Sequence, residues 1–343
     1  MVIPSFESLN LVSQVLRGLE KTDYPDLEVI IIDNASTDGT VDILEHFEDR
    51  CAVIYNSENV GFAAAQNQAI ALSRGDWVLT LNPDVFLLPG FIEALLEGGR
   101  LDPGVGTVCG KLFSMSPGFE IPDQPIVDST GIYFTPTLRH LDRGSQEVDR
   151  GHYVNFEYVF GATAAAALYS RQMIDDIAIN GEFFDSDFFV YREDADVAWR
   201  AQLLGWRCLY TPLAVGYHVR RVFPGVRRNL PSEINQHSVK NRFLMRIKNI
   251  TPGLYRRHWF SITVRDAVVV AACLLREHTS LKAFRFVFNN WTRTQAKRKE
   301  IMRRRRITDD DIARWFSFTP VSHPAPRPAG HTGTQTRANR GAG

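Results

Sequence analysis

The sequence predicts an α/β protein, with a mostly parallel sheet flanked by helices and a helical appendage at the C-terminal end. Three features predict this class: short β-branched runs alternate with helical patterns over the first hundred residues, polar residues follow the predicted strands, and helical spacing dominates beyond residue 231. With 343 residues, of which 44% are apolar, the chain can bury a large core. That composition excludes a wholly disordered or fibrous protein.

The predicted elements of the first hundred residues are short. Residues 2–3 predict a strand stub, and residues 9–19 predict a helix with apolar side chains at helical spacing. Residues 27–32 form an apolar run, interrupted only by Glu28, which is typical of a strand buried on both faces of a parallel sheet. The elements expected next are a helix ending at residue 47, a strand at 52–55, a helix at 61–72 and a strand at 77–81. This alternation indicates βαβ units, which bind ligands at the carboxyl ends of their strands.

The pattern loosens after residue 104. Residues 104–158 combine short strands with Pro/Gly turns, and residues 158–169 are rich in Gly and Ala. Residues 193–204 predict an amphipathic helix, which a strand at 207–210 follows. From residue 320 onward the composition is rich in Pro, Gly, Thr and Arg and poor in apolar residues, so we expect a disordered tail.

The charges are divided unevenly along the chain, although 39 Lys and Arg balance 39 Asp and Glu. Residues 1–216 hold 13 basic and 32 acidic residues, whereas residues 217–343 hold 26 basic and 7 acidic ones. The net charges of the two parts are therefore −19 and +19. A basic C-terminal part predicts an anionic partner: membrane headgroups, a phosphorylated substrate or nucleic acid.

The cysteines indicate a reducing, cytoplasmic setting. Cys51, Cys109, Cys208 and Cys273 are far apart and form no CxxC pair, which argues against a zinc ribbon or a disulfide scaffold. The late apolar run at 267–275 is too short to span a bilayer, so no transmembrane helix is expected. No charged and then apolar signal peptide opens the chain.

Four segments occur in an order and spacing that resemble a known family: VIIIDNASTDGT, NVGFAAAQNQA, WVLTLNPDV and FFVYREDADVAWRAQLLGWRCLYTPLAVGYH. They resemble the family 2 glycosyltransferases of the GT-A fold, especially the bacterial rhamnosyltransferase-like branch. The resemblance covers about residues 1–250 and implies a nucleotide-binding half at 1–100 and an acceptor and catalytic half at 101–250. A basic amphipathic helical region at 251–318 and a disordered tail at 319–343 would follow.

The nucleotide-sugar site is expected at the ends of the predicted strands. Asp33 closes a buried strand, and the resemblance implies that its carboxylate accepts hydrogen bonds from a nucleobase or a ribose. The alternative is a helix-capping loop, since Asp, Asn, Ser and Thr all cap helices well. Pro4 and Phe6 stand where the family has a longer strand ending in Tyr-Asn. The other expected members of this site are Asn34, Gly61, Asn67, Asn82, Asp84 and Gly161.

A divalent cation, Mg²⁺ or Mn²⁺, is expected next to the diphosphate. The family's DxD motif appears here as Asn82-Pro83-Asp84, so Asp84 keeps the metal-facing position and Asn82 replaces the first carboxylate. The resemblance implies that His218, which follows an apolar strand, can complete the metal site. An ordinary Pro-containing turn and a structural histidine are the alternatives.

The helix that opens with Glu193-Asp194-Ala195-Asp196 is expected to carry the catalytic acids. The resemblance implies that Asp194 is the base that takes the proton from the acceptor hydroxyl, while Glu193 orients the site. Asp196 lies about 200° around the helix from Asp194 and cannot share its role. The helix dipole alone also favours acidic residues in a first turn. Gly161 would lie under the donor sugar or would merely allow tight packing.

The C-terminal part is expected to contact an anionic membrane. Aromatic and basic residues mix between residues 255 and 306, a pattern typical of a helix lying on an anionic leaflet. Simple packing on the catalytic domain is the second alternative, and nucleic-acid binding is the third, because no nucleic-acid motif accompanies the charge. Four arginines after His218 could close over the diphosphate or belong to a solvated loop; they are Arg220, Arg221, Arg227 and Arg228.

The sequence thus predicts an inverting transfer of a sugar, such as rhamnose, from a dTDP- or UDP-sugar to a saccharide or lipid-linked acceptor of the cell envelope. The enzyme would be cytoplasmic or peripheral on the inner face of the cell membrane. A nicotinamide-dependent dehydrogenase is disfavoured because no GxGxxG turn follows the first strand. A non-catalytic protein that binds a membrane or nucleic acid is the other alternative. The enzymatic prediction requires that Asp84 and Asp194 face one activated sugar.

Overall fold

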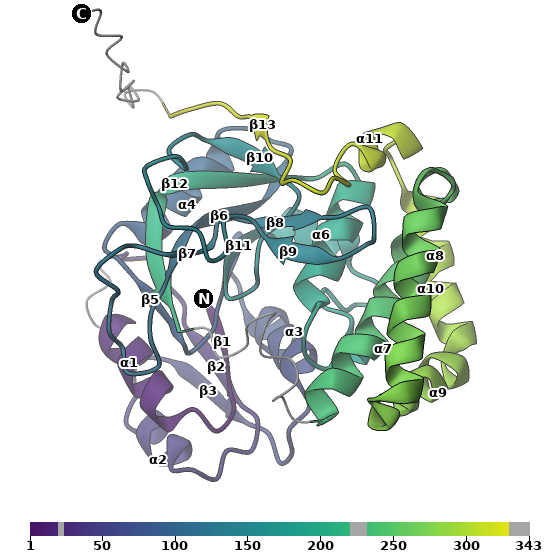
Figure 1. Ribbon diagram of the computed structural model, residues 1–343. Helices are drawn as coiled ribbons and strands as arrows, with labels where there is room; N and C mark the ends of the chain where they lie inside the picture. The colour runs from purple at the N-terminus through teal and green to yellow at the C-terminus, as the bar shows by residue number, and fades with distance from the viewer. Residues whose placement is uncertain (20–23, 220–231, 329–343) are drawn as a thin grey trace, which may run out of the picture.

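The computed structural model describes residues 1–19, 24–219 and 232–328. One large sheet with helices against it forms the body of the molecule, and a group of C-terminal helices packs along one side (Figure 1). The strands of the sheet follow the order β13-β10-β12-β6-β11-β4-β1-β2-β3, with β5 beside β12 and β7 beside β6. Strands β8 and β9 form a separate small sheet.

The strands are β1 (Val2–Ser5), β2 (Ile30–Asp33), β3 (Ala52–Tyr55), β4 (Trp77–Leu81), β5 (Val85–Leu87), β6 (Val105–Ser114), β7 (Val127–Ser129), β8 (Ile132–Phe134), β9 (His140–Asp142), β10 (Glu157–Val159), β11 (Ala166–Ser170), β12 (Arg207–His218) and β13 (His323–Pro324). The α-helices are α1 (Leu9–Leu19), α2 (Thr40–Glu45), α3 (Phe62–Leu72), α4 (Phe91–Arg100), α5 (Arg171–Ile177), α6 (Glu193–Leu203), α7 (Ser232–Asn249), α8 (Pro252–Leu275), α9 (Leu281–Asn289), α10 (Trp291–Arg304) and α11 (Asp309–Ala313). Two 3₁₀ turns, η1 (Ser186–Phe188) and η3 (His278–Ser280), complete the described elements.

The first half of the sheet is parallel, as the sequence predicts. Strand β1 pairs in parallel with β2 and β4, and β2 pairs in parallel with β3. Strands β1 and β2 are buried along their whole length, which explains the β-branched apolar residues at their starts, Val2-Ile3 and Ile30-Ile31-Ile32. The register places Ser5 beside Asp33, so the polar residues that follow these strands lie at one edge of the sheet.

The second half of the sheet brings distant segments to the same edge. Strand β11 runs antiparallel to both β4 and β6, and β12 runs parallel to β6. The far end of β12 pairs with β5, with His218 opposite Val85. Gly216 permits this pairing, because a Cβ atom there would lie 2.9 Å from the carbonyl oxygen of Phe86. His218 therefore lies next to the turn that carries Asp84.

Helix α6 is more deeply buried than an amphipathic surface helix. Ten of its residues, Glu193 and the run from Ala195 to Leu203, are buried between the sheet and α7. Its polar side chains satisfy each other and the backbone: Arg200 Nε donates to Asp196 Oδ2 at 2.9 Å, and Gln202 Nε2 donates to the Phe160 carbonyl at 2.9 Å. The amphipathic prediction is therefore corrected, since pairing rather than solvent satisfies the polar face.

The described part of the tail is ordered along an edge of the sheet, which corrects the prediction of disorder from residue 319 for residues 319–328. Strand β13 pairs antiparallel with β10. The hydroxyl of Ser322 donates to Glu157 Oε1 at 2.7 Å, and the Ala325 amide donates to the Phe156 carbonyl at 3.2 Å. The backbone groups on the outer side of β10 pair with this segment, which offsets the poor apolar content of the tail. Residues 329–343 lie outside the described residues.

The C-terminal helices form one layer that begins with α7. This helix contacts α6 on one side and α9 and α10 on another. The domain boundary at residue 250 stays a prediction, although it falls inside this helical layer.

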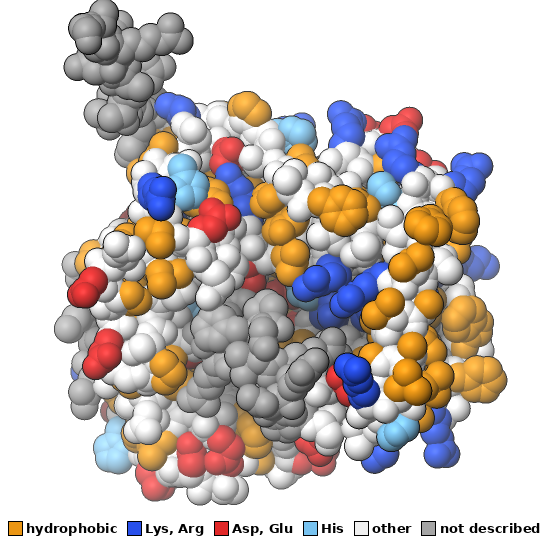
Figure 2. Space-filling model, in the orientation of Figure 1, with side chains coloured by type: hydrophobic (Ala, Val, Ile, Leu, Met, Phe, Trp, Pro, Cys, Tyr) orange, Lys and Arg blue, Asp and Glu red, His pale blue; other side chains and the backbone are white. Residues whose placement is uncertain are grey.

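Among the described residues, helix α8 alone is long and apolar enough to cross a membrane by length and composition, and it extends well beyond the apolar run at 267–275. Its apolar side chains include Trp259, Phe260 and Leu275, which are 55%, 65% and 77% exposed. Apolar side chains gather along the side of the molecule that α8 forms (Figure 2). Halfway along the helix, Asp266 pairs with Arg246 and, at 3.2 Å, with Arg242 of α7. These ion pairs hold α8 against the protein.

Candidate active site

The loop after β2 is held by its own side chains. Asp33 is buried, and its two carboxylate oxygens accept hydrogen bonds from the amide (2.9 Å) and the hydroxyl (2.6 Å) of Ser36. Asn34 accepts a hydrogen bond from Asn56 Nδ2 at 2.9 Å and donates to the Gly61 carbonyl at 3.5 Å. Asp33 thus stabilises the turn and stands at the edge where the sequence predicts the nucleotide.

Gly61 and Asn67, which the sequence also predicts at the nucleotide-sugar site, contact the segment that precedes α6. Gly61 has a φ of +86°, and a Cβ atom there would collide with the ring of Phe189. The amide of Asn67 bonds both backbone groups of Phe184: its Nδ2 donates to the carbonyl at 2.6 Å and its Oδ1 accepts from the amide at 2.9 Å. Gly61 and Asn67 therefore join α3 to the segment 184–189.

The first two residues predicted for the nucleotide-sugar site, Pro4 and Phe6, lie in strand β1 and just beyond its end. Pro4 is buried in the sheet opposite Ile32, whereas Phe6, just beyond the strand, is 48% exposed. Pro4 thus belongs to the core of the sheet, and Phe6 offers an apolar ring at the edge where β1 ends.

The turn after β4 contains buried oxygen atoms that accept no hydrogen bond from the described part of the chain. Its backbone is fixed, because the Asn82 amide donates to the Ala165 carbonyl at 2.8 Å. The Oδ1 atoms of Asn82 and Asp84 are buried, and neither has a hydrogen-bond partner among the described residues. Unsatisfied buried oxygens are rare in folded proteins and cost free energy, so they mark a place where a ligand would restore the missing contacts.

His218 joins this turn to β7. Its Nδ1 lies 2.7 Å from Asp128 Oδ2, and its Nε2 lies 3.4 Å from Asp84 Oδ1, which is an ion-pair distance. Burial alone would lower the pKa of His218, but the hydrogen bond to Asp128 and the nearness of Asp84 outweigh it and raise that pKa to about 9. Asp128 is not predicted from the sequence, because its only signal is a single acid within a short buried strand.

These residues fit a divalent cation by their chemistry. Asp84 offers a carboxylate oxygen and His218 an imidazole nitrogen, and Asp128 orients the ring as second-layer carboxylates do in metal sites. Among residues 1–19, 24–219 and 232–328, no group of three or more His, Cys, Asp or Glu side chains is arranged to hold a metal by itself. A cation bound here would therefore need further ligands from a diphosphate or from water.

The first turn of α6 holds two acids in different environments. Glu193 is 7% exposed, and its Oε2 has no hydrogen-bond partner in the described structure. Burial, followed by the charge of Asp194, raises the pKa of Glu193 well above its usual range, so the neutral acid is favoured. Asp194 is less buried, and its Oδ1 accepts a hydrogen bond from the Ala195 amide at 2.7 Å.

Asp194 and Gly161 border the same small cavity of about 10 Å³ between α6 and the sheet. A side chain at position 161 would collide with Ala198 of α6. The absence of a side chain at Gly161 therefore lets the helix approach the sheet. The sequence left packing and a place beneath the donor sugar as alternatives, and the packing role is visible in the structure.

Tyr191 connects the two groups of acids electrostatically. Burial raises its pKa, and the charges of Glu193 and Asp84 raise it further. The charges of both the turn after β4 and the first turn of α6 therefore act on Tyr191. Asp194 raises the pKa of Tyr169, for which burial is the larger cause. The convergence of Asp84 and Asp194 on one sugar stays a prediction. The arginines at 220, 221, 227 and 228 lie outside the described residues.

Solved structures with the same architecture share the GT-A fold, which confirms the predicted fold class. GalNAc-T7 with UDP, GalNAc and Mn²⁺ aligns with a TM-score of 0.58 and 12% identity over 72% of this chain and 47% of that one. The mannosyltransferase PcManGT from Pyrobaculum calidifontis, in complex with GDP-Man and Mn²⁺, aligns with a TM-score of 0.51 and 18% identity over 88% and 84%.

Curated relatives include glycosyltransferases. The N-acetylglucosaminyl-diphospho-decaprenol L-rhamnosyltransferase of Mycobacterium tuberculosis is 28% identical over 57% of this chain and 67% of that enzyme. The uncharacterized protein y4gI of Sinorhizobium fredii is 26% identical over 64% and 24%, and the putative teichuronic acid biosynthesis glycosyltransferase TuaG of Bacillus subtilis is 34% identical over 24% and 34%. The chain thus spans about a third or less of the length of the latter two proteins.

The family described as glycosyl transferase family 2 matches residues 1–177, which is more than half of the chain. The four sequence segments, the sheet topology and this match agree. The chain therefore belongs to glycosyl transferase family 2.

Proposed function

We propose that this enzyme transfers a sugar from a nucleoside-diphosphate sugar to a hydroxyl of a saccharide or lipid-linked acceptor in cell-envelope polysaccharide synthesis, with inversion at the anomeric carbon. The observation that carries the proposal is the pair of unsatisfied buried oxygens on Asn82 and Asp84 beside His218. The rhamnosyltransferase among the relatives, and the poly-β-1,6-N-acetyl-D-glucosamine synthase of Staphylococcus aureus, support an envelope acceptor. A dTDP- or UDP-sugar, with rhamnose as first choice, is the proposed donor.

On the donor side, Asp84 and His218 would hold Mg²⁺ or Mn²⁺. Such a cation supplies positive charge to the diphosphate leaving group when it is bound. Asn82 and Asp33 offer oxygen atoms to the ribose or the base, and Asn34, Gly61 and Asn67 fix the backbone around them. The two neighbouring structures named with Mn²⁺ and a nucleotide or nucleotide sugar support a divalent cation beside the donor.

On the acceptor side, Asp194 would take the proton of the acceptor hydroxyl. The acceptor oxygen then forms a bond to the anomeric carbon as the bond from that carbon to the diphosphate oxygen breaks, which releases the nucleoside diphosphate. A single displacement of this kind inverts the configuration. Because Glu193 is held neutral, it adds no second negative charge beside the base and leaves Asp194 as the proton acceptor.

Donor binding tests the proposal directly. With dTDP-rhamnose or a UDP-sugar and Mn²⁺, we expect the wild-type enzyme to be stabilised by about 2.7 kcal/mol at a donor concentration of about 100 Kd. Asp84→Ala should lose this stabilisation, because the donor-side carboxylate is removed. Differential scanning fluorimetry with and without EDTA measures the effect. Asp123→Ala, which removes an exposed acid, is the matched control. Equal stabilisation of Asp84→Ala and wild type would contradict the donor site.

We further propose that α8 lies on the inner face of the membrane. Its exposed Trp259 and Phe260, together with Phe288 of α9 and Trp291 of α10, offer an apolar face among basic residues. The pairing of Asp266 with two arginines of α7 favours a helix that lies on the surface rather than one that crosses the bilayer.

Sedimentation with phosphatidylglycerol-containing vesicles tests this surface. The double variant Trp259→Ser and Phe260→Ser should bind at least tenfold more weakly, since each large apolar side chain contributes about 1.5–3 kcal/mol when buried. Phe318→Ser, which changes an aromatic ring that is 69% exposed beyond α11, should bind like wild type. Equal vesicle binding by the double variant would exclude α8 as the membrane-facing element.

A further inference from the structure

The segment between η1 and α6 has a strained backbone. Phe189, Tyr191 and Arg192 have φ angles of +64°, +69° and +71°, although none of them is glycine. Bulky side chains rarely adopt this left-handed region, and such residues persist only where the surrounding contacts hold them. Glu193 and Asp194 follow directly, so whatever holds this segment also fixes where the two acids stand.

Helix α7 holds the segment through one fully buried amide. The Nδ2 atom of Asn241 lies 2.9, 2.8 and 2.7 Å from the carbonyl oxygens of Phe188, Val190 and Tyr191. An amide nitrogen has two hydrogens, so the three carbonyls share them. One side chain of α7 thus restrains three carbonyl groups within residues 188–191 of this segment.

The Phe189 ring also has packing contacts on two sides. It stacks on His237 of α7 with ring centroids 5.0 Å apart, and it fills the space above Gly61. Its carbonyl accepts a hydrogen bond from the Ala63 amide at 3.1 Å. The segment is therefore packed between α7 and the start of α3.

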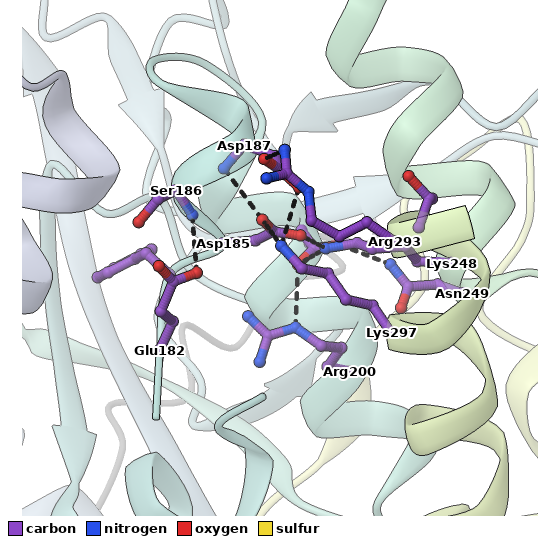
Figure 3. A network of polar contacts seen from close by, with 12 residues as sticks. Glu182, Asp185, Ser186, Asp187, Arg200, Lys248, Asn249, Arg293 and Lys297 are labelled. Carbon is purple, nitrogen blue, oxygen red and sulfur yellow. Dashed lines mark hydrogen bonds and ion pairs between the residues drawn. The ribbon is translucent and has the colours of Figure 1, made fainter. Parts of the chain in front are cut away.

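Two turns further along α7, Lys248 contacts two acidic residues that flank the strained segment, Asp185 and Asp196. Its Nζ donates to Asp196 Oδ2 at 2.9 Å and pairs with Asp185. Asn249 Nδ2 donates to the second oxygen of Asp196 at 2.7 Å, and Arg200 Nε donates to the first (Figure 3). Asp196 is two residues beyond Asp194, and Asp185 precedes the strained segment. Lys248 therefore ties both ends of the segment 185–196 together.

We infer that α7 is the positioning element of the active site, with Asn241 and Lys248 as positioning residues for Glu193 and Asp194. This inference rests on the proposed role of Asp194. Neither residue lies on α6 or on the sheet, so the C-terminal helical layer is part of the catalytic machinery. A base displaced by about 1 Å can cost about 100-fold in rate, which sets the size of the expected effect.

The isosteric Asn241→Asp replaces the donating amide with a carboxylate that faces three carbonyl oxygens. We expect its kcat to fall by about 100-fold, while the donor KM and the thermal shift on adding donor stay within twofold of wild type. Lys248→Met is the second variant, because Arg200 and Lys297 still neutralise Asp196 and Asp185 and keep the chain folded. Its kcat should fall at least tenfold with the same unchanged KM. Gln236→Glu, the same amide-to-acid change on the same helix, should leave kcat unchanged.

The outcomes separate this inference from the proposed function. Asp194→Asn is assayed in parallel. If Asp194→Asn abolishes transfer while folded Asn241→Asp or Lys248→Met retains wild-type kcat, only the positioning role is overturned. A raised donor KM with unchanged kcat would also overturn it, since that result assigns α7 to donor binding. If Asp194→Asn itself remains active, the proposed base is wrong.

Discussion

Asp194→Asn is expected to lower kcat by about 10²–10⁴-fold, the range that a positioned general base contributes. The amide has nearly the shape of the carboxylate but cannot take the acceptor proton. Donor binding should survive, because the donor-side residues Asn82, Asp84 and His218 belong to other elements. Release of nucleoside diphosphate, measured with acceptor present, reports the loss, and fluorimetry with donor reports the retained binding.

Glu193→Gln is the informative comparison for that experiment. Burial and the neighbouring Asp194 keep Glu193 neutral, so the neutral glutamine imitates the state that the side chain already has. We therefore expect a much smaller loss of kcat than for Asp194→Asn. The reverse order, with Glu193→Gln inactive and Asp194→Asn active, would assign the base to Glu193.

Asp185→Asn is expected to destabilise the protein by about 1.5–3 kcal/mol, the contribution of hydrogen bonds to a charged group, since Lys248 and Lys297 keep Asp196 and Asp187 as partners. Asp185 is 4% exposed and pairs with Lys248 and, at 2.6 Å, with Lys297 of α10. Burial alone would raise its pKa, but the two lysines outweigh burial and hold that pKa below its usual range. The pKa of Asp185 is lower in the folded state than in the unfolded state. The ionised carboxylate therefore stabilises the fold at pH values above the pKa of an unfolded Asp. This stabilisation is lost as the pH falls toward the folded-state pKa.

Urea unfolding at neutral pH and in acid measures this contribution. At neutral pH, the urea midpoint of Asp185→Asn should be lower than that of the wild type. In acid, the difference between the two midpoints should become smaller, because the wild type loses its own carboxylate charge. Glu300→Gln, which alters an exposed pair with Arg303 on α10, should leave the midpoint unchanged. An unchanged midpoint for Asp185→Asn would show that the buried network contributes nothing to stability.

Local patterns predicted the elements well. The apolar run of β2 and the helical spacing of α1 are properties of neighbouring residues, so a sequence shows them directly. The order of four motifs was enough to indicate the family, because those motifs lie at strand ends that the topology brings to one edge.

Partners that lie far apart in the sequence could not be predicted. Asp128 meets His218 from a distance of 90 residues, and Asn241 meets the carbonyl of Tyr191 from a distance of 50 residues. Neither pair has a fixed spacing or a periodic pattern. The burial of α6 was missed for the same reason, since its charged residues resemble a solvent-facing surface until their partners are known.

The uneven distribution of charge along the chain shows most clearly what the sequence and the tertiary structure each determined. The sequence by itself determined that an acidic body precedes a basic C-terminal part, and that the basic part needs an anionic partner. Only the tertiary structure decided that the chain supplies part of this partner itself, since Lys248 and Lys297 pair with Asp185, and Lys297 also pairs with Asp187. The physical reason is that composition fixes how many charges must be neutralised, whereas burial fixes which of them must meet, because a charge removed from water is stable only beside its opposite.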